Sequence, residues 1–282
     1  MTEHFLDTSV VRPMLLGTQA YQNYFSTQFS QGFCYTSPYV QMEVKRSYLR
    51  NIIEFYFTLQ VPILKTPADA LTYWSNRYQG SKHKAVQQMM AQLLDRASTD
   101  SAVLQDKESL LICIEELIQE FVELLETQFI NLENDSTACA RAIAPFDTGQ
   151  SSSTVEAIRR FTEAFDDTET CRRQCLVDQF ILIDRRPEVE AHIRQAQTLP
   201  KNSNTRGFLR IAENLQEILN QGEVACSCIR RERIGDAVIA LDAPRTMQLE
   251  HTDNSFDYLC PPIGQPHRKH PSETRIISGN GS

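Results

Sequence analysis

Phe5-Leu6-Asp7-Thr8-Ser9-Val10-Val11, near the start of the chain, sets the architecture into which the other segments must fit. Its apolar and β-branched residues predict a short strand buried in a sheet that is covered on both faces. Asp7 falls where this strand ends and a turn begins, so it is either a turn-forming residue or a group held at the carboxyl edge of the sheet. Open α/β sheets bind their ligands at that edge. Further carboxylates that return to the same edge would build a ligand site with Asp7.

The composition is that of an ordinary globular protein. The chain has 282 residues, of which 41% are hydrophobic and 23% charged, enough for one large domain or two modest ones with a real core. The net charge of −8 argues against broad, sequence-independent binding of polyanions but permits a local basic groove. We see no transmembrane run and no signal peptide, and we expect a cytoplasmic protein with no membrane partner. Eight scattered cysteines lack zinc-ribbon or redox spacing and are expected to be free thiols.

A second acidic residue follows a second predicted strand. Gly32 to Thr36 reads as a short strand, and Ser37-Pro38 then begins a helix, with Ser at the cap and Pro in the first turn. Glu43 lies in the second turn of this helix, beside its apolar stripe. Taken alone, Glu43 is most simply a solvated helix residue that pairs with a nearby Lys or Arg. A functional role for Glu43 therefore depends on the other motifs.

The middle of the chain is predicted to be mostly helical. Its longest helix lies within residues 101–132 and carries a wide apolar face of the kind that packs in an antiparallel hairpin or against a partner helix. That face is formed by Leu110, Leu111, Ile114, Leu117, Ile118, Phe121, Leu124 and Leu125. The glutamates of the opposite face are expected to be solvated rather than to bind metal.

Two more acidic residues appear near the C-terminus. Ile234 to Leu241 reads as a helix of small residues with Asp236 at its start, where a carboxylate suits the helix dipole. Met247 to His251 reads as a strand, and Asp253 lies in the turn after it. Two strands ending in Asp and two helices with an acidic residue near the start would place four carboxylates around one pocket.

Together these four segments resemble a PIN-domain nuclease. In chain order they are Phe5-Leu6-Asp7-Thr8-Ser9, then Ser37-Pro38 with Glu43, then Gly235-Asp236-Ala237 with Ile239-Ala240, then His251-Thr252-Asp253 with Phe256 and Leu259. Their order and local contexts all agree with the family, which is far more specific than any single motif. The pattern is similar to the single-domain endoribonucleases of bacterial toxin–antitoxin pairs.

The resemblance implies an α/β fold with a central parallel sheet flanked by helices. It covers only the two ends of the chain, because Glu43 and Asp236 are much farther apart than in simple PIN domains. We therefore expect a PIN-like core in two parts, residues 1–66 and 222–262. A large α-helical insertion, 67–221, lies between them, and a tail rich in Pro, Gly and Ser, 263–282, is expected to be disordered.

The resemblance also implies the site residues and the cofactor. Four carboxylates match the catalytic and metal-binding residues of the family: Asp7, Glu43, Asp236 and Asp253. Small hydroxyl residues beside them, which would contact a carboxylate or a phosphate, are Thr8, Ser9 and Thr252. Asp257 matches a frequently acidic position after the last motif. Mg²⁺ or Mn²⁺ is the expected cofactor, since hard cations take oxygen ligands and neutralise charge during phosphodiester hydrolysis.

Contacts to the phosphate backbone are expected from basic residues near the acidic motifs. Arg46 and Arg50, on the helix of Glu43, are the leading candidates for binding the substrate. Others with the same potential role are Lys45, Arg230, Arg231, Arg233, Arg268 and Lys269. His251 is either a general acid or, more simply, a histidine at the end of a strand that hydrogen-bonds to the backbone.

The sequence thus predicts a metal-dependent endonuclease that cleaves RNA in preference to DNA, as a toxin, a host-defence effector or an RNA-processing enzyme. The alternative is a catalytically idle PIN-like module that binds RNA or a protein through the helical insertion. An intact acidic quartet argues against it, because a binding module has no need to hold four like charges together. A third interpretation is that the apolar stripe of the insertion mediates self-association or binds an antitoxin.

Overall fold

The computed structural model describes residues 2–78, 80, 83, 86–87, 90, 106–132, 154–166, 176–221 and 233–272. The chain divides into two compact units. The first comprises Met1–Met42, Gln128–Ile143 and Asp167–Ser282, and the second comprises Glu43–Thr127 and Ala144–Asp166. Among the described helices, none is both long enough and apolar enough to cross a membrane.

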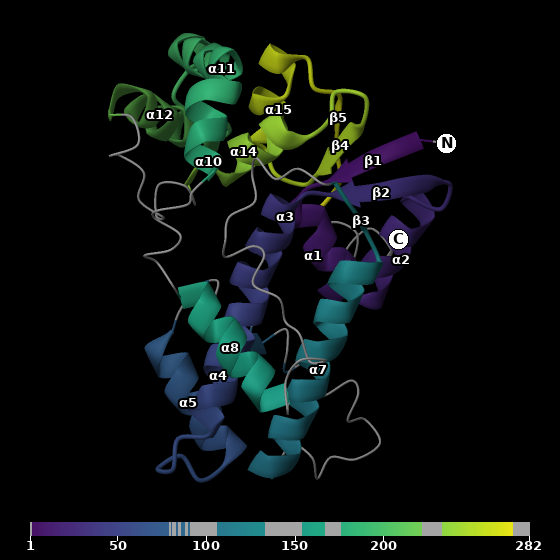
Figure 1. Ribbon diagram of the computed structural model, residues 1–282, viewed down its shortest axis with the longest axis vertical. Coiled ribbons are helices and arrows are strands. Elements are labelled where there is room, and N and C mark those ends of the chain that lie inside the picture. The colour runs from purple at the N-terminus through teal and green to yellow at the C-terminus, as the bar shows by residue number, and fades with distance from the viewer. Residues whose placement is uncertain are drawn as a thin grey trace. The chain divides into compact units, whose positions relative to one another are not determined.

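The first unit is built on a five-stranded sheet in the order β3-β2-β1-β4-β5, with every neighbouring pair parallel (Figure 1). The strands are β1 (Thr2–Leu6), β2 (Gly32–Thr36), β3 (Ile130–Asn131), β4 (Gln248–His251) and β5 (His267–Lys269). This confirms the expected α/β class and its parallel sheet. β1 is the central strand, and Phe5 and Leu6 are fully buried, as the opening motif predicts.

Successive side chains of a strand point to opposite faces of the sheet, and the two faces contact different helices. On one face, the His4 ring lies 5.0 Å from that of Phe29, at the end of α2 (Gln19–Gln28). On the other face, the His251 ring lies 4.9 Å from that of Phe256, at the start of α15 (Phe256–Leu259). Each face is therefore covered by a different set of helices.

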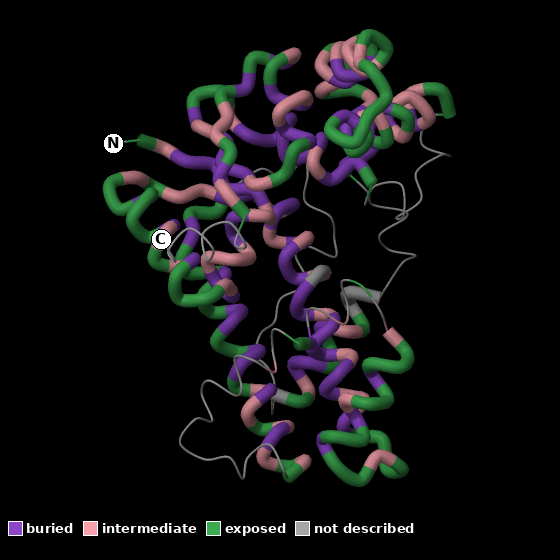
Figure 2. Tube along the Cα trace, turned by 180° about the vertical axis from the view of Figure 1, so that it is seen from behind, coloured by how far each residue is buried: buried purple, intermediate pink, exposed green. Residues whose placement is uncertain are grey.

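The helices of the first unit follow the strands closely. α1 (Thr8–Leu16) begins directly after β1 and packs against α2 and β4, and α3 (Pro38–Val44) begins after β2. α14 (Gly235–Asp242) packs against α15, and α15 is joined to β5 by the short 3₁₀ helix η6 (Pro261–Ile263). All residues of α14 except Asp236 are buried, and Figure 2 shows this concentration of buried residues beside the inner strands.

A group of helices from the expected insertion also belongs to the first unit. They are α10 (Leu176–Gln179), the π-helical turn η4 (Phe180–Asp184), α11 (Arg186–Thr198) and α12 (Arg206–Gln221). α11 packs against α12 and η6, and its buried His192 hydrogen-bonds to the carbonyl oxygen of Leu259 at 2.8 Å. These residues therefore extend the sheet-bearing unit.

The second unit is helical. It contains the π-helical turn η1 (Lys45–Leu49), α4 (Arg50–Leu59), α5 (Pro67–Arg77), α7 (Lys107–Thr127) and α8 (Thr154–Asp166). α4 packs against α5, α7 and α8. The Tyr48 and Phe121 rings lie 5.0 Å apart, and the Phe55 and Trp74 rings lie 5.7 Å apart. Most of the apolar face of α7 is consequently buried inside this unit, although Leu124 is exposed.

The structure corrects several expectations. The β-branched pair Val10-Val11 belongs to helix α1 instead of the strand, since β1 ends at Leu6 and Asp7 caps the helix. The residues 263–272 of the supposed tail are ordered, because β5 pairs with β4 from Leu249 to His251. The other tail residues, 273–282, lie outside the described residues.

Candidate functional site

Asp7 lies at the carboxyl edge of the sheet, where the sequence places it. Its backbone N–H donates to the carbonyl oxygen of Glu250 at 3.1 Å, which continues the pairing of β1 with β4 by one residue. Its carboxylate accepts a hydrogen bond from the backbone N–H of Ser9 at 2.9 Å and so caps the N-terminus of α1. Asp7 therefore fulfils both sequence interpretations, as a turn-forming cap and as a carboxylate at the sheet edge.

The Asp7 carboxylate is buried, with only 3% of the residue exposed. Burial raises the pKa of Asp7 to about 6, because the charged form is poorly solvated there. The hydrogen bonds from Ser9 and Thr8 work in the opposite direction, and the negative charge of Asp253 raises the pKa further. A carboxylate in this environment gains from a nearby cation.

Ser9 connects the ends of the two neighbouring strands. Its hydroxyl donates to Asp7 Oδ2, and its Oγ accepts a hydrogen bond from the backbone N–H of Thr252 at 3.0 Å. The sequence predicts that Ser9 and Thr252 contact a carboxylate or a phosphate. In this structure Ser9 orients Asp7, and Thr252 takes part through its backbone.

Asp253 is exposed and follows β4, the strand next to β1. Its side chain accepts a hydrogen bond from the backbone N–H of Ser255 at 2.7 Å, a local turn that fixes the carboxylate just before α15. The residue before it, Thr252, donates its backbone N–H to the Ser9 hydroxyl that also bonds to Asp7, so the two motifs meet at the ends of β1 and β4. The structure thus brings the first and last acidic motifs together.

Asp236 lies in the first turn of α14, partly buried, as its motif predicts. Because α14 packs against α15, the third acidic motif belongs to the same region of the first unit as the turn that holds Asp253. Cys260, directly after α15, is a buried thiol. Burial above all, and then the negative charges of Asp257 and Asp7, raises the pKa of this thiol to about 12.

Glu43 is the first residue of the second unit and is partly buried on α3. It therefore belongs to a different unit from Asp7 and Asp253, which both lie in the first. Arg46 lies in η1, and Arg50 begins α4, where its Nε is 3.4 Å from Glu54 Oε1. Both arginines also belong to the second unit.

Several of the other basic candidates already have acidic partners. Lys45 is buried, with burial lowering its pKa, and its Nζ lies 3.7 Å from Glu126 Oε1. Arg268 Nε donates to Glu250 Oε2 at 2.8 Å, and Lys269 Nζ donates to Asp257 Oδ2 at 2.6 Å. Arg233 is exposed, whereas Arg230 and Arg231 lie outside the described residues.

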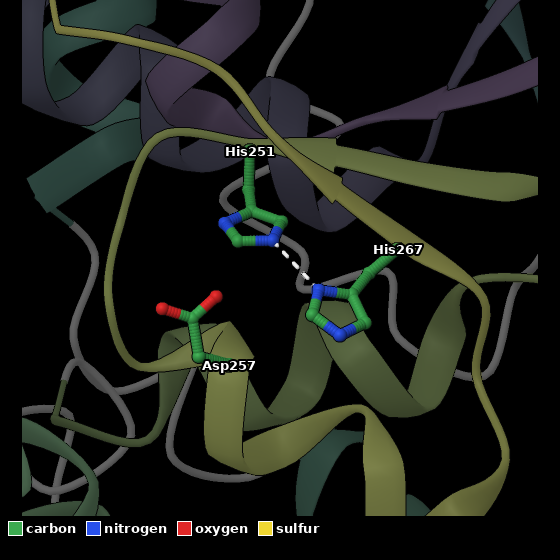
Figure 3. A group of neighbouring side chains, drawn as sticks. All are labelled: His251, Asp257 and His267. Carbon is green, nitrogen blue, oxygen red and sulfur yellow. Dashed lines mark hydrogen bonds between the residues drawn. The ribbon is translucent and has the colours of Figure 1, made fainter.

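A second group of polar side chains, shown in Figure 3, comes from β4, β5 and α15. His251, Asp257 and His267 each offer one ligand atom, and these atoms lie within 4.8 Å of one another. His251 Nδ1 is 2.9 Å from the carbonyl oxygen of Asp253. Burial, reinforced by the charge of His267, lowers the pKa of His251 to about 4. His251 is thus neutral at pH 7, which favours its interpretation as a backbone-bonded histidine over that of a general acid.

Sequence reasoning missed His267 because it assigned this residue to a disordered tail. No local pattern marks His267 as functional, since its position depends on the pairing of β5 with β4. Asp7 and Asp253, in contrast, have a local sequence signal, since each lies within two residues of the end of a strand.

The oxygen donors at the sheet edge fit a hard divalent cation. The buried carboxylate of Asp7 carries an unfavourable charge, and a second carboxylate, Asp253, adds to it. Mg²⁺ and Mn²⁺ prefer such donors together with water. Asp7 and Asp253 would hold the ion, and Asp236 is a third oxygen donor of the same region.

Comparison of the chain with protein-family models, with curated proteins and with solved structures finds no match.

Proposed function

We propose that this protein is a metal-dependent endonuclease that hydrolyses phosphodiester bonds, in RNA in preference to DNA, as its resemblance to PIN-domain nucleases implies. The observation that supports it best is the pair of neighbouring carboxylates, Asp7 and Asp253. They follow adjacent parallel strands at the edge where open α/β sheets bind ligands. Asp7 is the buried member of the pair, and none of its described contacts comes from a positively charged side chain.

In this proposal the residues of the chain have separate tasks. Asp7 and Asp253 hold the cation, and Ser9 keeps the Asp7 carboxylate in one orientation through its hydroxyl. Bound Mg²⁺ or Mn²⁺ would supply Lewis-acid stabilisation of the phosphoryl oxygens and lower the pKa of a water molecule. Asp236 would add a third carboxylate, whose negative charge attracts the cation.

Cleavage of labelled single-stranded RNA, structured RNA and DNA in Mn²⁺, Mg²⁺ or EDTA tests the proposal. The informative variants are Asp7→Asn and Asp253→Asn. Asn retains a side-chain oxygen for the helix cap at position 7, so the first variant changes the charge with little change in fold.

Asp106→Asn is a matched control. Asp106 caps α7 in the second unit and accepts from the backbone N–H and hydroxyl of Ser109, at 2.8 and 2.7 Å, much as Asp7 does with Ser9. We expect metal-dependent cleavage that is lost in both site variants and kept in the control. Absence of both cleavage and metal binding in the unmodified protein would refute the proposal and favour the idle, RNA-binding or protein-binding alternative.

A further inference from the structure

Two histidines and one aspartate from three different elements converge on the α15 side of the sheet. His251 ends β4, His267 begins β5, and Asp257 lies on α15. Their ligand atoms lie within 4.8 Å of one another, and Figure 3 shows the two imidazoles and the carboxylate pointing toward a common centre. His251 is fully buried and the other two are partly buried.

The hydrogen bond of His251 to the backbone determines which of its nitrogens faces this centre. A carbonyl oxygen can only accept, so Nδ1 of His251 carries the proton that it donates to the carbonyl of Asp253. Nε2 of the neutral ring is then a lone-pair donor, and it lies 3.0 Å from Nδ1 of His267. A ligand histidine held through its other nitrogen in this way is the usual arrangement at metal sites.

The separation of the two imidazole nitrogens fits joint coordination of one ion. Two nitrogens that bind Zn²⁺ tetrahedrally, each at about 2.0–2.1 Å, lie roughly 3.3 Å apart. The present 3.0 Å is close to that value. Coordination would replace the hydrogen bond between the rings, with the proton of His267 moving from Nδ1 to Nε2, so neither ring changes its net charge.

Lys269 competes for the third donor. Its Nζ donates to Asp257 Oδ2 at 2.6 Å and also to the side chain of Asn254. An ion that binds Asp257 must share this carboxylate with Lys269 or displace the ammonium group, and the like charge of Lys269 opposes binding. Removal of Lys269 should therefore strengthen binding.

We propose that His251, His267 and Asp257 form a site for a divalent transition-metal ion with a preference for nitrogen ligands, with Zn²⁺ as the representative. Two imidazoles and one carboxylate select such ions over Mg²⁺, and water or substrate completes the coordination. The ion joins β4, β5 and α15, and thereby fixes the edge strand of the sheet. This site stands apart from the proposed nuclease activity, because its donors differ from Asp7 and Asp253.

Zn²⁺ and Co²⁺ titrations of the full chain test this site. Zn²⁺ affinity is measured by competition with a chromogenic chelator, and the visible absorption of bound Co²⁺ reports its ligands. The variants are His267→Gln, Asp257→Asn and Lys269→Met. His83→Gln, which alters a histidine of the second unit, is the control.

We expect His267→Gln and Asp257→Asn each to weaken Zn²⁺ binding by more than about 100-fold, beyond the 10- to 100-fold effect typical of outer-shell partners. Lys269→Met should tighten binding several-fold, and His83→Gln should leave it unchanged. Equal Zn²⁺ affinity in the unmodified protein and His267→Gln would overturn the proposal. So would a thiolate-to-cobalt charge-transfer band that persists in His267→Gln, because the ion would then be bound by cysteines.

Discussion

The substitution Asp7→Asn should make the protein more stable at neutral pH, in a way that depends on pH. Burial raises the pKa of Asp7 from 3.8 to about 6. Between these values the folded state binds more protons than the unfolded state, so the free energy of unfolding falls as the pH rises. With 1.36 kcal/mol for each pKa unit, the loss amounts to about 3 kcal/mol above pH 6. Asn has no charge to bury and keeps the cap, so the variant should escape this loss.

Urea unfolding of both proteins from pH 4 to pH 8, without divalent ions, measures the effect. Relative to the unmodified protein, the free energy of unfolding of the variant should rise by roughly 2.4 kcal/mol between pH 4 and pH 7, with most of the change between pH 4 and pH 6. Asp106→Asn should show the opposite sign, because hydrogen bonds from Ser109 hold the pKa of Asp106 below its ordinary value. If the free energy of unfolding of Asp7→Asn and of the unmodified protein changed in parallel with pH, the conclusion that the buried Asp7 carboxylate destabilises the fold would be refuted.

Three further substitutions test the contacts on which the account depends. Ser9→Ala removes the hydroxyl that bridges the two strand ends, and we expect a loss of about 1–3 kcal/mol in urea unfolding together with reduced metal affinity; unchanged values would contradict the bridge. Glu250→Gln breaks a buried network in which two histidines and an arginine bind one carboxylate, and should cost about 3–5 kcal/mol by the same assay; a loss below about 0.5 kcal/mol would be inconsistent with it. Tyr56→Phe removes the hydroxyl that donates to Glu115, and should lower the thermal midpoint by the equivalent of about 1 kcal/mol; an unchanged midpoint would argue against this bond.

The sequence predicted those parts of the fold whose signal is local. β1 is an apolar run that ends at Asp7, β2 is followed by a Ser-Pro helix start, and β4 leads into the turn at Asp253. In each case the strand and the turn or helix start that follows it are close together in the chain, so one short stretch of sequence shows both. The end of a strand in a parallel sheet is also the ligand-binding edge, so the positions of Asp7 and Asp253 followed from the same pattern.

The parts that the sequence did not predict depend on contacts between distant segments. β5 consists of His267, Arg268 and Lys269, which carry no apolar alternation. The strand forms because its backbone pairs with β4 and because Arg268 reaches the buried Glu250. β3, with two residues after a long helix, is too short to show a period.

The burial of Lys45 was likewise unpredicted. In a helical pattern Lys45 reads as a polar residue available to a phosphate, but its side chain is covered by the packing of the second unit and lies near Glu126. The apolar stripe of α7 shows the converse case. Its period correctly predicted a packed face, and the partners proved to be helices of the same unit.

Equilibrium binding of Mn²⁺, followed by electron paramagnetic resonance of the free ion, tests the carboxylate site most directly. All proteins should carry His267→Gln, so that the imidazole cluster contributes nothing. We predict an ion bound in this background and in its Asp106→Asn derivative, and binding at least about 10-fold weaker on adding Asp7→Asn. Equal Mn²⁺ affinity with and without Asp7→Asn would contradict the assignment of Asp7 as a metal-holding carboxylate.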